Sequence, residues 1–366
     1  MDTSDPSITF DDYGVCDHCN DFYSSVRPRW HPNHFGKRQA MDICDQIKKS
    51  SSKGGFNCIL GLSGGLDSSY LLHLAVKEFG LKPLVFHVDA GWNTDVSTSN
   101  IENITNKLNL DLYTEVIEWE AVRDFQLALF KSGTPYLDLA QDHAFFATMY
   151  NFAEKYNIKW ILNGGNISTE GIRNPKSIYY YGTDMSFIRD IRDQFCTTPM
   201  TGYPWSSIYK HKIYLKYIKK INVFRMLNYL PYNKQKAITE LSSTYGFKPY
   251  PQKHFESVFT RYFESYWLPT RFGFDPRRVQ LSSLIVTEQM SREEALNVLK
   301  QQSFDPSTID LDSQYIADKL DISIEQLNSY YKLPLKYYMD YRNESKIFDA
   351  GARILKKIGL EYAIKR

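Results

Sequence analysis

The sequence predicts an α/β protein whose parallel sheet carries helices on both faces. Short apolar runs of strand length alternate with longer segments in which apolar residues recur at the helical period. A glycine- and serine-rich turn joins the first of these strands directly to a helical segment. Such alternation is typical of parallel sheets, which bind ligands at the carboxyl ends of their strands. A mostly helical C-terminal region follows, and a small segment with a Cys-x-x-Cys pair precedes the sheet.

The predicted elements follow in order along the chain. Strands are expected at residues 57–62, 82–89, 112–119 and 159–163. Helices are expected at residues 35–49, 67–79, 100–110, 120–131, 143–156, 233–245, 291–301, 312–320 and 323–332. The helix at 291–301 opens with a capping box formed by Ser291 and Glu294. A linker is expected from Ser50 to Gly55. Three parts are predicted: an N-terminal segment 1–50, a nucleotide-binding domain 51–205 and a helical domain 206–366 for substrate and partner binding.

The turn after the first strand has the composition of an anion-binding loop. It reads Ser63-Gly64-Gly65-Leu66-Asp67-Ser68-Ser69. A strand–turn–helix unit directs backbone N–H groups and a helix N-terminus at one point, where anions bind. The two glycines let a phosphate approach the backbone closely, and the serines add hydroxyl donors. Asp67 fits such a site if a divalent cation joins it to phosphate. The alternative is a glycine-rich turn that binds nothing.

Two further strand ends are expected at the same edge of the sheet. Asp89 follows the second strand, close to His87, and is a candidate ligand of the ribose or of a metal. The fourth strand ends in Asn163-Gly164-Gly165-Asn166, followed by Ser168 and Glu170. These polar side chains are candidates for contacts with the nucleotide or the acceptor substrate. The alternative at both places is a turn, because Gly, Asn and Asp are common turn residues.

Composition excludes several classes of protein. The 44 Lys and Arg nearly balance the 42 Asp and Glu, so the net charge gives no support for a nucleic-acid partner. No apolar run reaches about 18 residues, and the N-terminus lacks the pattern of a signal peptide. Five cysteines, an odd number in a long chain, do not form a disulfide framework. We therefore expect a cytoplasmic protein without a membrane span.

Two local patterns allow two interpretations each. Cys16 and Cys19 have the spacing of a zinc-binding pair, which His31 and His34 could complete; the alternative is two unrelated surface cysteines. The stretch from Lys210 to Lys220 alternates lysines with apolar residues. It is interpreted either as a helix with a solvated basic face or as a surface for a partner or nucleic acid.

The glycine-rich loop resembles a known nucleotide-binding motif. No Gly-Lys-Ser or Gly-Lys-Thr follows its glycines, so it is not an ordinary P-loop. Ser-Gly-Gly-x-Asp-Ser-Ser resembles the pyrophosphatase loop (PP-loop) of the N-type ATP pyrophosphatases, which include GMP, NAD, asparagine and argininosuccinate synthetases and tRNA-thiolating enzymes. The resemblance implies an adenine nucleotide alpha hydrolase-like fold, with ATP and Mg²⁺ as cofactors. It also implies that the loop holds the pyrophosphate released when a substrate oxygen is adenylated.

Over nearly its whole length the chain is similar to the N-acetyl sugar amidotransferases of surface-polysaccharide (lipopolysaccharide O-antigen) biosynthesis. The stretches that carry this similarity are Asp2 to Pro6, Gly14 to Cys19, Gly61 to Tyr70, His87 to Thr94, Gln141 to Ala144, Leu227 to Tyr229, Lys253 to Arg261, and Arg277-Arg278. The family pattern has another Cys-x-x-Cys before Asp2. The chain begins at Met1, inside that pattern. Either the start is trimmed or the first Cys-x-x-Cys pair is missing, and a four-cysteine zinc site would then be incomplete.

The similarity implies a reaction and a set of site residues. The acetamido group of a sugar, or nucleotide-sugar, would become an acetamidino group through an adenylated imidate attacked by ammonia. The implied catalytic residues are Ser63, Asp67, Lys253, His254, Glu256 and Arg261. The implied nucleotide-binding residues are those from Ser63 to Ser69, with His87, Asp89, Asn163, Gly164 and Asn166. Asp67 is the implied Mg²⁺ ligand, and Cys16 and Cys19 are the implied Zn²⁺ ligands.

The similarity also implies a source of ammonia, and two other functions fit parts of the sequence. The chain has no recognisable glutaminase triad, so the similarity implies a separate glutaminase with a cyclase-like subunit, akin to the pair of histidine biosynthesis. A rival is a tRNA-modifying PP-loop enzyme, favoured by the Cys-x-x-Cys pair and the lysines at 210–220 but opposed by the near-neutral charge. A non-enzymatic ATP-binding subunit is the third hypothesis, and it would bind ATP without exchanging pyrophosphate.

Overall fold

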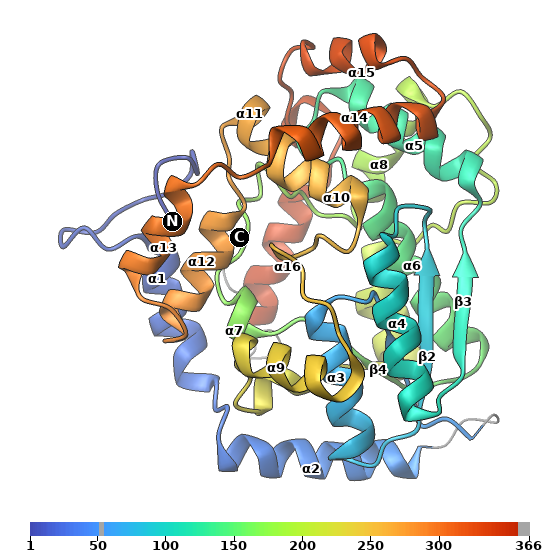
Figure 1. Cartoon of the computed structure of the whole chain (residues 1–366), viewed down its shortest axis with the longest axis vertical. Helices are drawn as coiled ribbons and strands as arrows, with labels where there is room; N and C mark the ends of the chain where they lie inside the picture. The colour runs from blue at the N-terminus through green and yellow to red at the C-terminus, as the bar shows by residue number, and fades with distance from the viewer. Residues whose placement is uncertain (51–54, 358–366) are drawn as a thin grey trace.

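The computed structural model describes residues 1–50 and 55–357, with side chains described up to residue 354 (Figure 1). Residues 51–54 of the predicted linker lie outside this range, as does the end of the predicted helical domain beyond residue 357. The described residues contain no helix that is long and apolar enough to cross a membrane.

The described part of the chain contains a five-stranded, all-parallel sheet in the order β3-β2-β1-β4-β5. The strands are β1 (Cys58–Gly61), β2 (Pro83–Asp89), β3 (Leu112–Val116), β4 (Trp160–Leu162) and β5 (Asn222–Phe224). The chain moves outward from β1 through β2 to β3, and then returns to the other side of β1 to form β4. Parallel sheets bind ligands where the strand order reverses in this way, which here is between β1 and β4.

Helices cover both faces of the sheet, and further helices pack to one side of it (Figure 1). The α-helices are α1 (Asp17–Asp21), α2 (His34–Lys49), α3 (Leu66–Lys77), α4 (Asp95–Leu108), α5 (Trp119–Ser132), α6 (Leu139–Lys155), α7 (Ile167–Glu170), α8 (Met185–Phe195), α9 (Lys234–Tyr245), α10 (Val258–Tyr262), α11 (Leu268–Phe272), α12 (Arg277–Val286), α13 (Arg292–Lys300), α14 (Pro306–Leu320), α15 (Ile324–Tyr331) and α16 (Ser345–Lys357). Shorter π or 3-10 segments are η1 (Phe22–Val26), η2 (Arg27–Arg29), η3 (Lys210–Ile218), η4 (Met226–Tyr229), η5 (Phe263–Trp267) and η6 (Tyr338–Asp340).

The predicted fold class is confirmed, and so are the four predicted strands as elements. Strand β3 ends at Val116 rather than at residue 119, because Trp119 already begins α5. Helix α4 begins five residues before its predicted start, because the Thr94 hydroxyl accepts from the Ser97 N–H at 3.2 Å and caps it. Strand β5 was not predicted, since three residues show no periodicity. It lies beyond residue 205, so the sheet takes one strand from the predicted C-terminal part.

Alternate residues of the central strand face two different cores. Leu60 packs on one face with side chains of α2, α3, α4 and α9. Ile59 packs on the other face with residues of α6 and η3. A third and larger core is aromatic, and its buried members include Phe22, Trp92, Phe259 and Tyr341. The N-terminal segment, the sheet domain and the C-terminal helices therefore share one core.

Candidate functional site: an anion-binding cavity at the PP-loop

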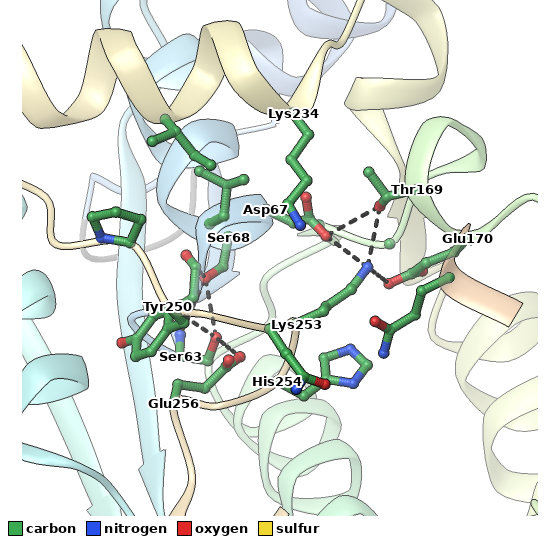
Figure 2. Close-up of a pocket in the computed structure, with 18 of the residues that line it drawn as sticks. Ser63, Asp67, Ser68, Thr169, Glu170, Lys234, Tyr250, Lys253, His254 and Glu256 are labelled. Atoms are coloured by element: carbon green, nitrogen blue, oxygen red, sulfur yellow. Dashed lines mark hydrogen bonds and ion pairs between the residues drawn. The ribbon is translucent and has the colours of Figure 1, made fainter. Parts of the chain in front are cut away.

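A cavity opens beside the turn that follows β1, next to the loop that follows β4 (Figure 2). Its wall is built from six segments: the turn and the start of α3, the loop after β4, α7, α9, residues 247–256, and α12. The lining residues are Ser63, Gly65, Leu66, Asp67, Ser68, Gly164, Gly165, Thr169, Glu170, Lys234, Ile238, Phe247, Pro249, Tyr250, Gln252, Lys253, His254, Glu256, Gln280 and Leu284. The cavity therefore lies at the reversal point of the sheet, where a ligand is expected.

The turn after β1 requires glycine at one position. Gly64 has a φ of +78°, and a Cβ there would lie 2.5 Å from the backbone oxygen of Ser97. The left-handed conformation disfavours a side chain, and the close approach to Ser97 excludes one. The next residue, Gly65, is the N-cap of α3. It has no side chain to accept a hydrogen bond from the first N–H groups of this helix, so these groups lack a capping side chain. These N–H groups and the helix dipole favour an anion in the cavity.

Asp67 is the centre of a hydrogen-bonded cluster (Figure 2). Its carboxylate accepts from the Tyr232 hydroxyl, from Lys253 Nζ at 3.0 Å and from the Thr169 hydroxyl at 3.4 Å. Lys253 Nζ also donates to Glu170 Oε1 at 2.6 Å, so one ammonium group bridges two carboxylates. Burial opposes the charge of Asp67, but Lys253 and Tyr232 outweigh it and hold the pKa of this carboxyl below its usual value.

Three cationic side chains line the cavity. Burial opposes the charge of Lys253, but Asp67 and Glu170 raise the pKa of its ammonium above the usual value. Lys234, the first residue of α9, has a lowered pKa because it is partly buried and lies near Lys253. Burial also opposes the positive charge of the His254 imidazole, but the nearby Glu264 carboxylate raises its pKa to about 9. The cluster therefore suits a polyanion such as a triphosphate.

The segment 252–257 lies across the loop as a strap. The Glu256 carbonyl oxygen accepts from the Thr94 N–H at 3.0 Å, and Ser257 forms a β-bridge with Asn93. The Ser63 hydroxyl donates to Glu256 Oε1 at 3.3 Å. Burial raises the pKa of the Glu256 carboxyl. The strap thus brings Lys253, His254 and Glu256, nearly 190 residues away in sequence, against the loop.

Not every predicted site residue lies in the cavity wall. The structure places Ser63, Gly65, Leu66, Asp67, Ser68, Gly164, Lys253, His254 and Glu256 there. The wall does not include Gly64, Ser69, His87, Asp89, Asn163, Asn166 or Arg261. Gly64 shapes the turn, and Ser69 is buried at the start of α3.

The other predicted residues outside the wall hold the surrounding loops. His87 Nδ1 contacts the Leu62 carbonyl oxygen at 2.8 Å, and Asp89 accepts from the Gly91 N–H at 2.7 Å. Asn163 accepts from the Gly165 N–H at 2.8 Å, and Asn166 caps α7 by accepting from the Thr169 N–H at 2.9 Å. In this structure the contacts of these side chains are therefore those of turn-forming residues, which was the alternative interpretation of the two loops.

Arg261 was predicted to be catalytic, but the structure gives it a different position. Its guanidinium makes a bidentate pair with Asp312, at 2.8 and 2.6 Å, and so joins α10 to α14. Several lining residues were not predicted, among them Thr169, Lys234 and Gln280. Lys234 falls at the start of a predicted helix, but no sequence pattern places that helix beside the loop.

The donor set fits Mg²⁺ better than Zn²⁺. Asp67 and Glu170 supply carboxylate oxygens beside the anion site, and Mg²⁺ is commonly held by one or two carboxylates together with substrate phosphates. Cys16 is buried and hydrogen-bonded to Cys19, which lowers the pKa of the Cys16 thiol to about 5. Across residues 1–50 and 55–357 no three His, Cys, Asp or Glu side chains gather as a metal site, so His31 and His34 do not complete one. The described residues thus do not fit a closed, four-ligand zinc site.

Two family models match separate parts of the chain. Residues 57–164 match the phosphoadenosine phosphosulfate reductase domain, and residues 256–355 match the C-terminal domain of WbpG-like LPS biosynthesis proteins. An argininosuccinate synthase from Ehrlichia chaffeensis is 30% identical over 78 residues, which are 21% of this chain. The chain matches only 20% of the length of that enzyme.

The solved structures that match the chain have low sequence identity and low TM-scores. The NH3-dependent NAD synthetase of Campylobacter jejuni is 16% identical with a TM-score of 0.30, and the match covers 82% of this chain and 97% of that one. The NMN synthetase of Francisella tularensis is 17% identical with a TM-score of 0.29, covering 60% and 99%. The U34-tRNA thiolase of Methanococcus maripaludis is 10% identical with a TM-score of 0.33, covering 75% and 88%.

The parallel sheet, the loop after β1 and the reductase-domain match together give residues 57–164 the features of a PP-loop domain. Residues 256–355 are in turn similar to the C-terminal domain of the WbpG-like proteins of LPS biosynthesis. The resemblance seen in the sequence is confirmed at this level.

Replacing Asp67 by Asn tests the centre of the cluster. The substitution keeps the shape of the side chain but removes the charge that pairs with Lys253 and fits Mg²⁺. We expect ATP-dependent pyrophosphate release to fall by about 10²–10³-fold, the usual loss for one strong electrostatic contact. Asp124→Asn is the matched control, because Asp124 is buried and hydrogen-bonded to Thr197 and Thr198 outside the cavity wall. A folded Asp67→Asn protein that releases pyrophosphate at the wild-type rate would contradict this role.

Arg261→Gln tests whether this residue is structural. Asp312 is buried, so the substitution leaves its carboxylate without its cationic partner. We expect the free energy of unfolding to fall by about 3 kcal/mol. ATP affinity of the folded protein, measured by calorimetry, should stay within twofold of wild type, roughly the limit of such a comparison. A large loss of ATP affinity with an unchanged free energy of unfolding would instead support a role for Arg261 in the binding site.

Proposed function

We propose that this protein is an ATP-dependent amidotransferase that converts the acetamido group of a sugar into an acetamidino group during LPS or related surface-glycan biosynthesis. The observation that carries the proposal is the cavity in which the PP-loop meets Asp67, Lys253, Lys234 and His254. The match of residues 256–355 to a WbpG-like domain of LPS biosynthesis supports the class of substrate. The reaction would take place in the cytoplasm.

The first step activates the amide. The amide oxygen of the sugar attacks the α-phosphorus of ATP, so that an O–P bond forms and the bond to the leaving pyrophosphate breaks. The amide N–H proton is lost, which gives an O-adenylated imidate. Glu256 is our candidate acceptor for that proton, because its carboxyl group lies in the cavity wall next to Ser63.

The second step exchanges the oxygen for nitrogen. Ammonia adds to the imidate carbon, and AMP leaves with the original amide oxygen. Loss of one proton from the added nitrogen leaves a neutral amidine. The sum is amide, ATP and ammonia giving amidine, AMP, pyrophosphate and two protons.

The chain contributes mainly electrostatic stabilisation and positioning. The N–H groups at the start of α3 and the serine hydroxyls of the loop donate to the departing pyrophosphate. Lys253, Lys234 and His254 lower the cost of bringing its negative charges together. Asp67 and Glu170 would hold Mg²⁺, which supplies further charge neutralisation on the phosphates. No covalent bond to the protein is needed.

One assay tests this proposal. The protein is incubated with ATP, Mg²⁺, ammonium and a panel of nucleotide-sugars, and products are analysed by mass spectrometry. We expect replacement of one oxygen by NH in an N-acetylated sugar, with AMP and pyrophosphate formed in equal amounts. Parallel reactions contain tRNA with a sulfur donor. Modification of tRNA, with no change in any sugar, would overturn the proposal in favour of the thiolase-type function.

The proposed nitrogen source leads to a prediction on pH and glutamine. Free ammonia is mostly protonated at neutral pH, so the isolated chain should work with high ammonium at alkaline pH and fail with glutamine. Closed sites exclude water, which would otherwise return the substrate amide. We propose that a separate glutaminase with a cyclase-like subunit delivers ammonia, and that adding it restores the use of glutamine. Efficient use of glutamine by the isolated chain would rule out an external source.

The basic stretch from Lys210 to Lys220 is our candidate docking surface for that partner. Lys216 and Lys220 are exposed, and Ile213, Tyr217 and Ile218 expose apolar surface beside them. Interfaces commonly combine tyrosine and apolar side chains with a charged rim. The surface fits an acidic partner face.

Charge reversal at Lys216 and Lys220 tests this surface. We expect Lys216→Glu with Lys220→Glu to lower glutamine-dependent turnover about tenfold or more, because like charges would then meet across the interface. Ammonium-dependent turnover should not change. Lys48→Glu with Lys49→Glu, on the exposed end of α2, is the matched control. Unchanged coupling in the first pair would remove the docking assignment and leave the reaction untouched.

A further inference from the structure

His254 is held in an unusual backbone conformation inside the cavity wall. Its φ is +67°, in the left-handed region that residues other than glycine rarely adopt. The side chain is 41% exposed, and the residue lines the cavity with Lys253. Backbone strain of this kind persists where surrounding contacts over-determine it, and it clusters at functional sites.

The contacts that hold His254 come from a buried carboxylate. Nδ1 of the imidazole lies 3.1 Å and 3.2 Å from the two carboxylate oxygens of Glu264. Glu264 belongs to η5 and is only 7% exposed. Among the described residues, no hydrogen bond to protein occupies the other ring nitrogen, Nε2, which is therefore free for a ligand.

Glu264 is itself fixed from the opposite side. The Tyr179 hydroxyl donates to Glu264 Oε1 at 2.9 Å. The Tyr179 ring packs against Tyr136, with ring centroids 5.0 Å apart, and also against Phe263. A tyrosine, a carboxylate and a histidine from three separate segments thus form a chain that ends at the cavity.

Other charged groups also face His254. On the strap these are Lys253 and Glu256; Asp67 of α3 and Asp142 of α6 face it from the sheet domain. Burial raises the pKa of Asp142 to about 6, and His254 opposes that rise. Burial and Lys253 disfavour the charged imidazolium, whereas Glu264 and Glu256 favour it. Together the two carboxylates have the larger effect, so the pKa of His254 is raised. His254 therefore carries its charge throughout the neutral range.

We propose that Glu264 is a positioning residue that holds His254 as a phosphate-facing cation, with Nε2–H directed at the phosphates of a bound nucleoside triphosphate. This inference rests on the ATP site of the proposed function, but it does not depend on the sugar or on the nitrogen donor. His254 makes the direct contact, Glu264 sets its protonation and direction, and Tyr179 holds Glu264. No sequence pattern links these three residues.

The predicted pH dependence has a definite sign. The interaction raises the pKa of His254, so its charge is present below about pH 9 and is lost above it. In Glu264→Gln the imidazole loses its ionic partner, and it should then titrate nearer the ordinary value of about 6.5. The variant should consequently lose the cation between pH 6 and 8, whereas the wild type should keep it.

The test measures MgATP affinity by calorimetry at pH 6, 7 and 8, and the titration of His254 by NMR. We expect Glu264→Gln to lose about tenfold in affinity from pH 6 to 8 relative to wild type, which is one pKa unit of interaction. His254→Gln should be weak at every pH and should lack that difference. The pKa of Asp142 depends on both Glu264 and His254, so the NMR titration of His254 is needed to assign the difference between the two affinity profiles to His254.

Two further variants protect the test against a failure of folding. Tyr179→Phe leaves Glu264 in place but frees it on one side, so it should lower the His254 pKa by a smaller amount. Asp312→Asn removes another buried carboxylate of an ion pair and should leave the His254 titration unchanged.

Three outcomes decide between the two proposals. Identical pH profiles for wild type and Glu264→Gln, or a wild-type His254 that titrates near 6.5, would overturn the role of Glu264. MgATP that does not bind the wild type at any pH would instead remove the proposed function. The NMR titration would still decide whether Glu264 holds the histidine charged.

Discussion

The ion pair between Asp67 and Lys253 is the interaction on which the rest of the site depends. Asp67 lies in the first turn of α3, and Lys253 comes from the strap that leads into the C-terminal helices. Their contact at 3.0 Å joins the strap to the start of α3, and Glu170 accepts from the same ammonium group. Removing the charge of Lys253 would leave the Asp67 carboxylate partly buried without its counter-ion, which is costly. The pair therefore fixes how the strap lies on the loop, and through the strap it fixes His254 and Glu256.

The loop and the sheet around it could be predicted because their signals are local. Gly64 has a positive φ and lies too close to Ser97 for a side chain, so the need for glycine follows from the turn itself. The strands show apolar runs because both faces of a parallel sheet are covered, as the opposite environments of Ile59 and Leu60 confirm. Strand β5 escapes prediction because its three residues belong to the sheet only through their pairing with β4.

The wall of the cavity was harder to predict because it is assembled by tertiary packing. Tyr232 reaches Asp67 across 165 residues of sequence, and Lys253 does so across 186. Family motifs identified the strap, and they also included Arg261, whose charge is used to join α10 to α14. A motif marks residues that belong together in the fold, but it does not separate those that face the ligand from those that hold the scaffold. Glu264 illustrates the converse: it lies outside every motif, and only its distance to His254 reveals it.

The shared aromatic core limits how such proteins can diversify. Phe22, Trp92, Phe259 and Tyr341 belong to one buried cluster, although they come from parts of the chain more than 300 residues apart. The segments matched by the two family models, 57–164 and 256–355, both contribute to it. A recombinant chimera that joins this PP-loop unit to a foreign C-terminal half would have to match side-chain shapes across a dry interior, since core packing tolerates few misfits. Substrate preference in this lineage is therefore expected to change by substitutions around the cavity rather than by exchange of whole modules.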